Sequence, residues 1–330
     1  MVIEGKKASI LLVLKTLEEY SDEEHFLTYQ QIIDLISKNY DVELERKSIA
    51  NSIAVLQDLD YEIEKGPKGG FALFSRTLDR SEVSFLVDAI FSSKSVPGKE
   101  AKKLADKVSS CLSKHDRKSY DYLVKSEDIS RTDNKEVFYN IEIISEAIRK
   151  NKWVGFRYRE YNKDGERTTR FHGYVYHCSP CYLISNYGHY YLIAYRPKYD
   201  SVATYRIDFM QDVEIMTERE RLDPKEMKEF KNYKSISEYL NEHIYLFGGD
   251  AIKVKMKVLK GSSLSAVYDW FGNNAKVRKE NDELIAEVRC DEQAFFYWAL
   301  QYEQDIQILE PQSMIDKLKD AAQKISEKYK

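Results

Sequence analysis

The arrangement of hydrophobic and polar residues between His172 and Ile215 predicts a compact block of β-strands. β-Branched and aromatic residues come in short runs here, and no helical period competes with them. Turn-forming residues separate the runs, as they do between short antiparallel strands. These breaks are Ser179-Pro180, Tyr187-Gly188 and Lys198–Ser201.

Two further strands are expected just upstream, over Val154–Tyr161 and Arg167–Tyr176. They flank the turn Asn162–Gly165, in which the Asp-Gly pair strongly favours a hairpin. Together the runs give about five strands within roughly sixty residues, which suits a small barrel or a sharply curled sheet.

The N-terminal part of the chain has a helical pattern instead. Apolar residues recur at three- and four-residue spacings in Ala8–Tyr20, in a segment that Thr28 opens, and in Arg46–Leu59. Gln31 follows Thr28 by three residues, which is a capping box for the second helix. A glycine-rich two-stranded ribbon is expected over 61–74. This order predicts a winged helix-turn-helix, whose third helix would enter the major groove of DNA.

Helical patterns return after this module. Leu78–Leu123 reads as polar-faced helices with too little apolar surface for a separate domain, so we expect a linker that also lends a dimer surface. Ser126–Lys135 is polar and is expected to be a loop, and Glu136–Asn151 is an amphipathic helix. Beyond Gly248-Gly249 the order is strand, helix, two strands, helix, strand and a closing helix, which predicts a ferredoxin-like βαββαβ unit.

These patterns predict an α+β multidomain chain, and its 330 residues suffice for two or three domains. The expected parts are an N-terminal winged helix-turn-helix (1–75), a helical linker and dimerisation region (76–135), a β-barrel (136–220), a connector (221–250) and a C-terminal ferredoxin-like βαββαβ extension (251–330).

Composition is that of a globular protein, with 32% charged and 43% hydrophobic residues. No apolar run approaches the roughly eighteen residues of a membrane-spanning helix, and the N-terminus has no secretory cleavage pattern. Four scattered cysteines are too few for a disulfide framework, so we expect reduced thiols and a cytoplasmic location. The net charge of −4 says little about partners, so charge is considered locally.

The third predicted helix carries the residues expected to contact DNA. Ile49, Ile53 and Leu56 mark its buried face, and Lys47 and Asn51 lie on the opposite one. Such side chains donate to base edges and phosphates, and lysines of the ribbon would contact phosphates. The DNA-binding residues that we predict are Arg46, Lys47, Ser48, Asn51, Lys65 and Lys68.

The charge of this module favours a different partner. Residues 1–75 hold 8 Lys/Arg against 14 Asp/Glu, a net charge of −6, whereas a DNA-binding domain is usually basic. We expect the acids to lie away from the third helix and the ribbon, as Asp22, Glu23 and Glu24 do in the loop after the first helix. Double-stranded DNA is the expected partner, and a winged helix that binds another protein is the alternative.

Arginines and tyrosines concentrate in the predicted barrel. The stretch from Arg149 to His172 holds eight Lys/Arg against three Asp/Glu, and Arg196 and Arg206 follow among several tyrosines. Guanidinium groups bind phosphate through paired hydrogen bonds, and aromatic rings stack on bases. The pattern fits a site for a nucleotide or single-stranded nucleic acid. It fits an ordinary solvated face, with tyrosines packed on the sheet, equally well.

The motif Cys178-Ser179-Pro180-Cys181 is the one feature that points to metal or redox chemistry. Structural zinc sites bring a second Cys or His pair at a regular spacing, and this sequence has none. Redox pairs of this spacing lie at a helix N-terminus, whereas strands are expected on both sides here. We therefore expect no enzyme, no catalytic residue, no metal ligand and no cofactor, with a zinc or redox protein as the remaining alternative.

The stretch Gly188–Ala194, followed by Thr204–Asp208, resembles the WYL domain family, which is named for a Trp-Tyr-Leu triplet. The triplet is Tyr190-Tyr191-Leu192 in this sequence, and Ser179–Leu183 is similar to the strand entry of the family. The family's Arg-Leu-Asp-Arg pattern is Arg206-Ile207-Asp208-Phe209 here, so the second arginine is absent.

The order of modules is also similar to that of WYL regulators. The resemblance implies an Sm/SH3-like barrel for the WYL domain and a WCX extension at the C-terminus. It further implies a homodimeric bacterial transcription regulator, often a repressor, that senses a nucleotide or nucleic acid and commonly controls DNA-damage or phage-defence genes. Arg206 matches the family's pocket arginine, with Asp208 orienting it. The ligand-binding residues expected, in one pocket, are Ser179, Tyr182, Tyr191, Arg196, Tyr205, Arg206 and Asp208.

Overall fold

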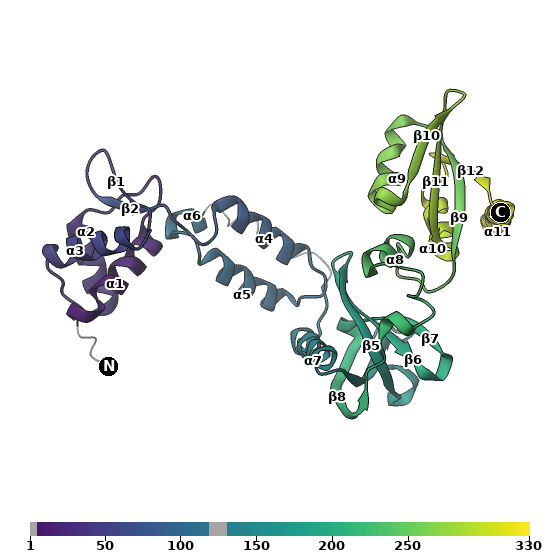
Figure 1. Ribbon diagram of the computed structural model, residues 1–330, viewed down its shortest axis with the longest axis horizontal. Coiled ribbons are helices and arrows are strands. Elements are labelled where there is room, and N and C mark those ends of the chain that lie inside the picture. The colour runs from purple at the N-terminus through teal and green to yellow at the C-terminus, as the bar shows by residue number, and fades with distance from the viewer. Residues whose placement is uncertain (1–4, 119–130) are drawn as a thin grey trace. The chain divides into compact units, whose positions relative to one another are not determined.

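The computed structural model describes residues 5–118 and 131–330, and Figure 1 shows their elements. By their internal contacts the residues divide into two compact units, Met1–Val137 with Tyr187–His189, and Phe138–Asn186 with Tyr190–Lys330. The predicted loop Ser126–Lys135 lies partly outside the described residues. Within the described ranges no helix combines the length and the hydropathy that a membrane crossing requires.

Three helices and a two-stranded antiparallel ribbon open the first unit, in the order that the sequence predicts. Leucine, isoleucine and valine side chains from all three helices form one core. The Thr28 hydroxyl accepts from the backbone N–H of Gln31, whose side chain accepts from that of Thr28, so the predicted capping box is confirmed. The elements are α1 (Gly5–Tyr20), α2 (Tyr29–Tyr40), α3 (Arg46–Asp58), β1 (Ile63–Lys65) and β2 (Phe71–Leu73).

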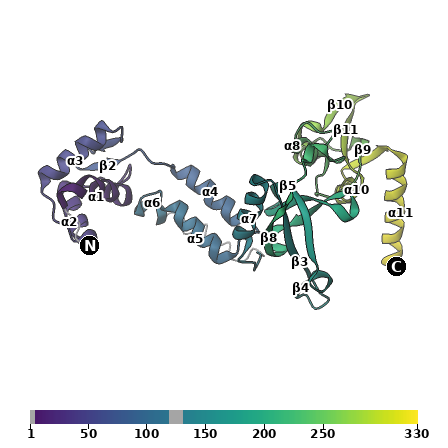
Figure 2. The same cartoon turned by 60° about the horizontal axis from the view of Figure 1, so that its bottom comes forward.

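Two helices with a small core of their own follow, and they lie side by side in Figures 1 and 2. α4 (Arg80–Ser92) begins at Asp79, which forms a second capping box, and α5 covers Gly98–Ser109. Just beyond α5, Ser110 donates its hydroxyl to the carbonyl of Lys107, and a short α6 (Lys114–Lys118) follows.

Polar side chains join α1 to the segment around α6. The Arg76 guanidinium donates to the carbonyl oxygens of Glu18 and Cys111, at 2.9 and 3.2 Å. Asp22 is buried and accepts from the hydroxyl of Ser113 at 2.6 Å, while Nδ1 of His25 lies 2.6 Å from the same carboxylate. Burial acts to raise the pKa of Asp22, but the hydrogen bonds from Ser113 and His25 outweigh it, so that this pKa is lowered.

Because its folded-state pKa is depressed, ionised Asp22 stabilises the fold above its ordinary pKa near 3.8, and this contribution is lost as the pH falls through the folded value. We expect Asp22→Asn to lower the free energy of unfolding at pH 7 by about 1–2 kcal/mol. The difference from wild type should shrink below pH 4, where the wild-type carboxyl is protonated too. Urea unfolding at several pH values measures it, and a difference that does not change with pH would contradict the assignment.

A curled six-stranded sheet and one helix begin the second unit. The strand order is β4-β3-β5-β6-β7, with β8 paired to β3. Phe156 and Leu192 are fully buried between the strands, and Asn140 ties the helix to the sheet by donating to the carbonyl of Met210 at 3.2 Å. The elements are α7 (Val137–Arg149), β3 (Lys152–Tyr161), β4 (Arg167–Thr169), β5 (Val175–Asn186), β6 (His189–Arg196), β7 (Ser201–Arg206) and β8 (Met210–Glu220).

The prediction of one continuous strand over Arg167–Tyr176 is wrong. β4 ends at Thr169, and a 3-10 turn, Arg170–Gly173, separates it from β5. Phe171 and His172 have left-handed backbone angles, with φ of 50° and 54°, and Gly173 follows with φ of 89°. Three consecutive left-handed residues cannot continue a strand. Figure 2 shows how the β3–β4 end projects from the sheet.

The C-terminal part has the predicted βαββαβ order. Its four strands are antiparallel in the order β10-β11-β9-β12, which is that of a ferredoxin-like unit. Phe271, Phe295 and Trp298 are fully buried in its core. The elements, after the connecting helix α8 (Ile236–Glu242), are β9 (Ala251–Val258), α9 (Leu264–Phe271), β10 (Lys276–Glu280), β11 (Glu283–Asp291), α10 (Glu292–Gln301), β12 (Ile306–Glu310) and α11 (Gln312–Lys328).

Candidate ligand site and nucleic-acid interface

The end of β7 holds a guanidinium and a buried carboxylate in a paired contact. Arg206 Nε donates to Asp208 Oδ1 at 3.0 Å, and its Nη2 donates to Oδ2 at 2.8 Å. The Asp208 side chain is fully buried, whereas 32% of the Arg206 side chain is exposed. Burial acts to lower the pKa of Arg206, but the hydrogen bonds and charge of Asp208 outweigh it and raise that pKa. Asp208 therefore orients a permanently charged donor group that still faces solvent.

A second arginine shares this carboxylate. Arg167 Nη2 lies 4.0 Å from Asp208 Oδ2, and only 9% of its side chain is exposed. The guanidinium groups of Arg206 and Arg167 lie 4.7 and 4.8 Å from the centroid of the Phe209 ring. Two guanidinium groups thus flank one buried carboxylate, and that of Arg206 stays partly exposed, where it can meet a further anion.

Tyrosine hydroxyls complete this group. The hydroxyl oxygen of Tyr158 accepts from the backbone N–H of Arg206 at 3.0 Å, and Tyr191 lies directly opposite Arg206 in the β6–β7 pairing. Burial raises the pKa of Tyr158 to about 12 and raises that of Tyr191 as well. Both phenols are therefore neutral near pH 7 and can donate hydrogen bonds. We call Arg167, Arg206, Asp208, Tyr158 and Tyr191 the arginine cluster.

Exposed aromatic rings lie on the turn and strand ends that adjoin the arginine cluster in sequence. Phe171 is 64% exposed on the left-handed turn, with the Arg170 guanidinium 4.8 Å from its ring centroid. Tyr174 and Tyr161 are also more than half exposed, at 51% and 57%. Tyr161 is tied to the arginine cluster, because Arg167 Nε donates to its hydroxyl at 3.0 Å. Exposed rings beside guanidinium groups are what unpaired bases stack on.

The structure does not bring all seven predicted ligand residues together. The β6–β7 pairing puts Arg196 opposite Ser201, at the other end of the hairpin from Tyr191 and Arg206. The expectation that the two arginines share one pocket is therefore wrong. Five residues of strand separate them, about 16 Å at 3.3 Å per residue.

Three other predicted residues serve the packing of the sheet. Ser179 is fully buried, and its hydroxyl accepts from the backbone N–H of Leu222 at 2.9 Å. Tyr182 packs edge-on against Phe230, with ring centroids 5.3 Å apart. Tyr205 is 6% exposed and lies in an aromatic cluster with Phe156 and Tyr158. Ser179 and Tyr205 therefore lie in the interior of the domain, and Tyr182 is half-buried against Phe230.

Sequence reasoning missed Tyr158, Arg167 and Phe209 as members of one site. Two of them were visible in the basic and aromatic stretch before His172. Their contacts with the residues at the end of β7 could not be predicted. These contacts depend on the pairing of β3 with β8, two strands that are far apart in the sequence.

The predicted DNA-contacting face of α3 is solvent-exposed. Lys47 and Asn51 are exposed there, opposite the buried Ile49 and Ile53, and Lys65 and Lys68 are exposed on the ribbon. Ser48 is half-buried in the first turn of the helix. Arg46 is in contact with α2, because its guanidinium lies 4.9 Å from the centroid of the Tyr29 ring.

Acidic residues also surround this face. Glu43 and Glu45 are exposed just before α3, and Glu62 and Glu64 are exposed on and beside β1. The expectation that acids lie away from the third helix and the ribbon is therefore wrong. Phosphate contacts by Lys65 would have to form close to Glu64.

The cysteines of the C-x-x-C motif lie inside the protein. Cys178 and Cys181 are both buried and unpaired by disulfides. Burial raises the pKa of Cys181 to about 12, and it raises that of Cys178 as well, so neither thiol ionises near neutral pH. Among the residues that the structure describes, no three His, Cys, Asp or Glu side chains are grouped so that they could hold a metal ion.

The second unit thus contains a small curled sheet with a paired arginine and aspartate at the end of β7. Residues 139–215 match the family model of the WYL domain. The chain contains a WYL domain, and the resemblance seen in Gly188–Ala194 and Thr204–Asp208 is confirmed.

No curated protein matches the chain. Among solved structures, it is similar to proteasome accessory factor B/C of Arthrobacter aurescens, with 15% identity and a TM-score of 0.29 over 96% of this chain and 47% of that one. The chain therefore spans about half the length of that relative. It is also similar to a CRISPR Cas-related protein, with 16% identity and a TM-score of 0.37 over 100% of this chain and 87% of that one. Both similarities are too distant to transfer a function.

Proposed function

We propose that the protein is a ligand-responsive, dimeric transcription regulator. Its winged helix-turn-helix would bind double-stranded DNA through α3 and the ribbon, and its WYL domain would bind a nucleotide or single-stranded nucleic acid at the arginine cluster. The observation that carries the proposal is the partly exposed Arg206 guanidinium, which the buried carboxylate of Asp208 orients and beside which Arg167 lies. A phosphate is the anion whose oxygens fit a guanidinium fork, and adjoining exposed rings suit bases.

Repression is the expected mode of action only because the chain resembles WYL regulators, which are often repressors. Control of phage-defence or DNA-damage genes follows from the same resemblance. The WCX extension is assigned to 251–330 and the linker to 76–135 as part of the same proposal.

The charge of the first module favours a second candidate. Residues 1–75 have a net charge of −6, and exposed acids flank α3. An acidic winged helix is suited to holding a basic protein surface, so the alternative is a WYL accessory protein that binds another protein through this module.

A gel shift of the full chain on its own promoter region, at low and at physiological salt, separates the two candidates. Specific retardation that persists against excess competitor DNA supports the regulator. Absence of duplex binding even at low salt would leave the accessory protein as the function.

The regulator should be a two-fold dimer whose half-sites lie about one helical turn of DNA, or a multiple of it, apart. A single acidic winged helix binds weakly, and linking two copies raises the effective concentration of the second. Phe85 on α4 is 73% exposed and offers an apolar contact for a partner helix. Light scattering at micromolar concentration measures the mass, and a monomer would contradict this expectation.

A further inference from the structure

One side of α5 carries a row of exposed lysines, while the other side packs against α4 through the buried Ala101 and Ala105. The lysines recur at three- and four-residue spacings, so their side chains share one surface of the helix. The helix also holds an exposed acid, Asp106, and a half-buried one, Glu100, which leaves it a net charge of +2. The four lysines, which we call the lysine row, are Lys99, Lys102, Lys103 and Lys107.

Most of the lysine row has no partner of opposite charge. Lys103 lies 3.5 Å from Glu100, and the other three lysines form no ion pair with any residue that the structure describes. Arg80 on the neighbouring helix, by contrast, pairs with Asp116 at 2.6 Å. An unpaired surface ammonium is hydrated and can bind an external anion without first giving up a contact within the protein.

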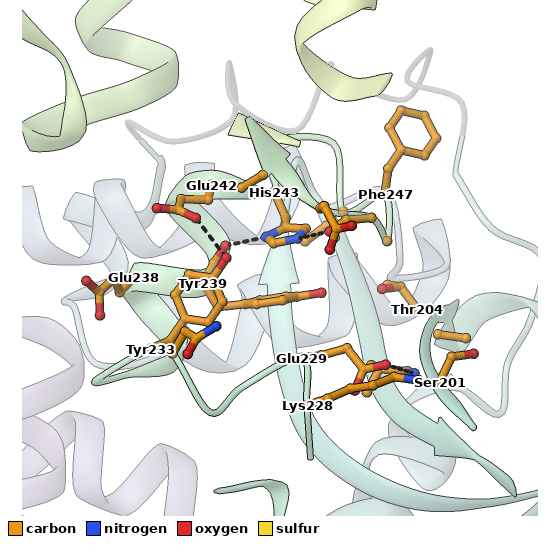
Figure 3. Close-up of a pocket in the computed structure, with 18 of the residues that line it drawn as sticks. Ser201, Thr204, Lys228, Glu229, Tyr233, Glu238, Tyr239, Glu242, His243 and Phe247 are labelled. Carbon is orange, nitrogen blue, oxygen red and sulfur yellow. Dashed lines mark hydrogen bonds between the residues drawn. The ribbon is translucent and has the colours of Figure 1, made fainter. Parts of the chain in front are cut away.

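Positive charge is balanced at the cavity of the second unit. Lys228 and Arg289 line the cavity shown in Figure 3, where Glu229 and Glu242 also lie. Lys228 pairs with Asp200 at 3.3 Å, and Arg289 pairs with Glu242 at 3.1 Å. That cavity therefore has no excess of cations for an anionic partner, in contrast to the lysine row.

The first module of the chain needs cations that it does not carry itself. Residues 1–75 have a net charge of −6, and the exposed lysines of α3 and the ribbon are Lys47, Lys65 and Lys68. Phosphate contacts supply a large share of the affinity for duplex DNA, so a module of this charge would depend on a basic neighbour. Residues 76–118 are such a neighbour, because they hold 10 Lys/Arg against 6 Asp/Glu, a net charge of +4.

The chain joins the lysine row closely to this module. α5 ends at Ser109, and just beyond it the Ser113 hydroxyl donates to Asp22 at 2.6 Å while Lys114 pairs with Glu19 at 2.8 Å. The row extends over eight residue steps, about 12 Å at 1.5 Å per residue. A DNA duplex carries one negative charge per roughly 1.7 Å of its axis, so a row of this length spans enough phosphates for each of its lysines.

From the unpaired charge of α5 and the acidity of the first module, we infer that the lysine row binds the phosphate backbone of duplex DNA outside the base pairs that α3 contacts. The inference rests on the proposed binding of DNA by the winged helix-turn-helix. A duplex is favoured over an acidic protein surface because the same compact unit holds the helix whose exposed face carries Lys47 and Asn51. The contact adds affinity and no sequence preference.

Fluorescence anisotropy of the full chain with its promoter duplex and with a scrambled duplex of the same length, at several salt concentrations, tests the inference. Lys99→Gln, Lys102→Gln and Lys107→Gln together should weaken binding of both duplexes at least about tenfold at low salt. The logarithmic slope of affinity against salt should fall by about 0.9 for each phosphate contact removed. The preference for the promoter should stay that of wild type. The melting temperature should also stay unchanged, because the three side chains are exposed.

A control variant removes the same charge from the C-terminal part. Lys276→Gln, Lys319→Gln and Lys328→Gln, all at exposed positions, should keep the wild-type slope. An equal fall of the slope in this control would show that only total charge matters and would overturn the inference. A lysine-row variant with wild-type slope and affinity would also overturn it and leave an acidic protein surface as the partner of α5. If the wild type binds no duplex even at low salt, the proposed function fails and the inference fails with it.

Discussion

Arg206→Gln should lower the affinity for a nucleotide or short single-stranded oligonucleotide at least tenfold and leave the affinity for duplex operator DNA unchanged. The substitution removes the exposed part of a charged fork, and each charge-assisted hydrogen bond removed corresponds to about 1.5–3 kcal/mol. The test is whether the substitution changes only the ligand affinity. A sensor has separate sites for the ligand and for DNA, and both act on one conformational equilibrium. Binding of each ligand is measured by titration, and the gel shift is repeated with it present.

Stability has to be separated from binding in this experiment. Removing the Arg206 guanidinium leaves the buried Asp208 carboxylate with Arg167 at 4.0 Å, and an uncompensated buried charge is strongly destabilising. Arg206→Gln combined with Asp208→Asn removes both charges and should recover the melting temperature but not the ligand affinity. Arg206→Lys keeps the charge without the fork and should bind with intermediate affinity. If Arg206→Gln reduces operator binding as much as Lys47→Ala does, the arginine cluster is not a sensor.

Lys47→Ala together with Asn51→Ala should abolish sequence-specific operator binding. Two good base contacts together contribute about 2–6 kcal/mol of discrimination, which is at least a thirtyfold preference for the operator. Both side chains are exposed, so the melting temperature should stay that of wild type. Gel shifts on the operator and on a scrambled duplex of the same length measure the preference.

Lys65→Ala with Lys68→Ala is the matched control on the ribbon. Phosphate interactions carry no sequence information, so this variant should bind every duplex more weakly and show a flatter dependence on salt. The logarithmic slope should fall by about 0.9 for each lysine–phosphate pair that the substitutions remove. A uniform loss of affinity in the Lys47/Asn51 variant, or a selective loss in the ribbon variant, would reverse the roles assigned to α3 and the ribbon.

The elements that the sequence predicts correctly are those with a local cause. Thr28 and Gln31 start α2 through a hydrogen-bond pair three residues apart, and the C-terminal βαββαβ order follows from strands and helices of clear period. At the break Phe171–Gly173 only Gly173 is a local cue, because Phe171 and His172 are bulky residues that rarely adopt left-handed backbone angles.

The candidate site was predictable in part. Arg206 and Asp208 are neighbours in sequence, and their pairing needs no knowledge of the fold. The misplacement of Arg196 was avoidable, since a hairpin turning at Lys198–Asp200 puts Arg196 opposite Ser201 and leaves Arg206 opposite Tyr191. Arg167 and Tyr158 could not be assigned, because their partners are more than thirty residues away in the chain.

The left-handed turn at Phe171 and His172 also limits how the protein can evolve. Each non-glycine residue there carries about 1 kcal/mol or more of backbone strain, which glycine would relieve. Selection for stability alone would therefore replace Phe171, yet glycine would remove the exposed ring beside Arg170. Descendants of this sequence that have lost the need for a stacking surface should drift toward glycine at 171 and 172, so these two positions record whether that surface is still in use.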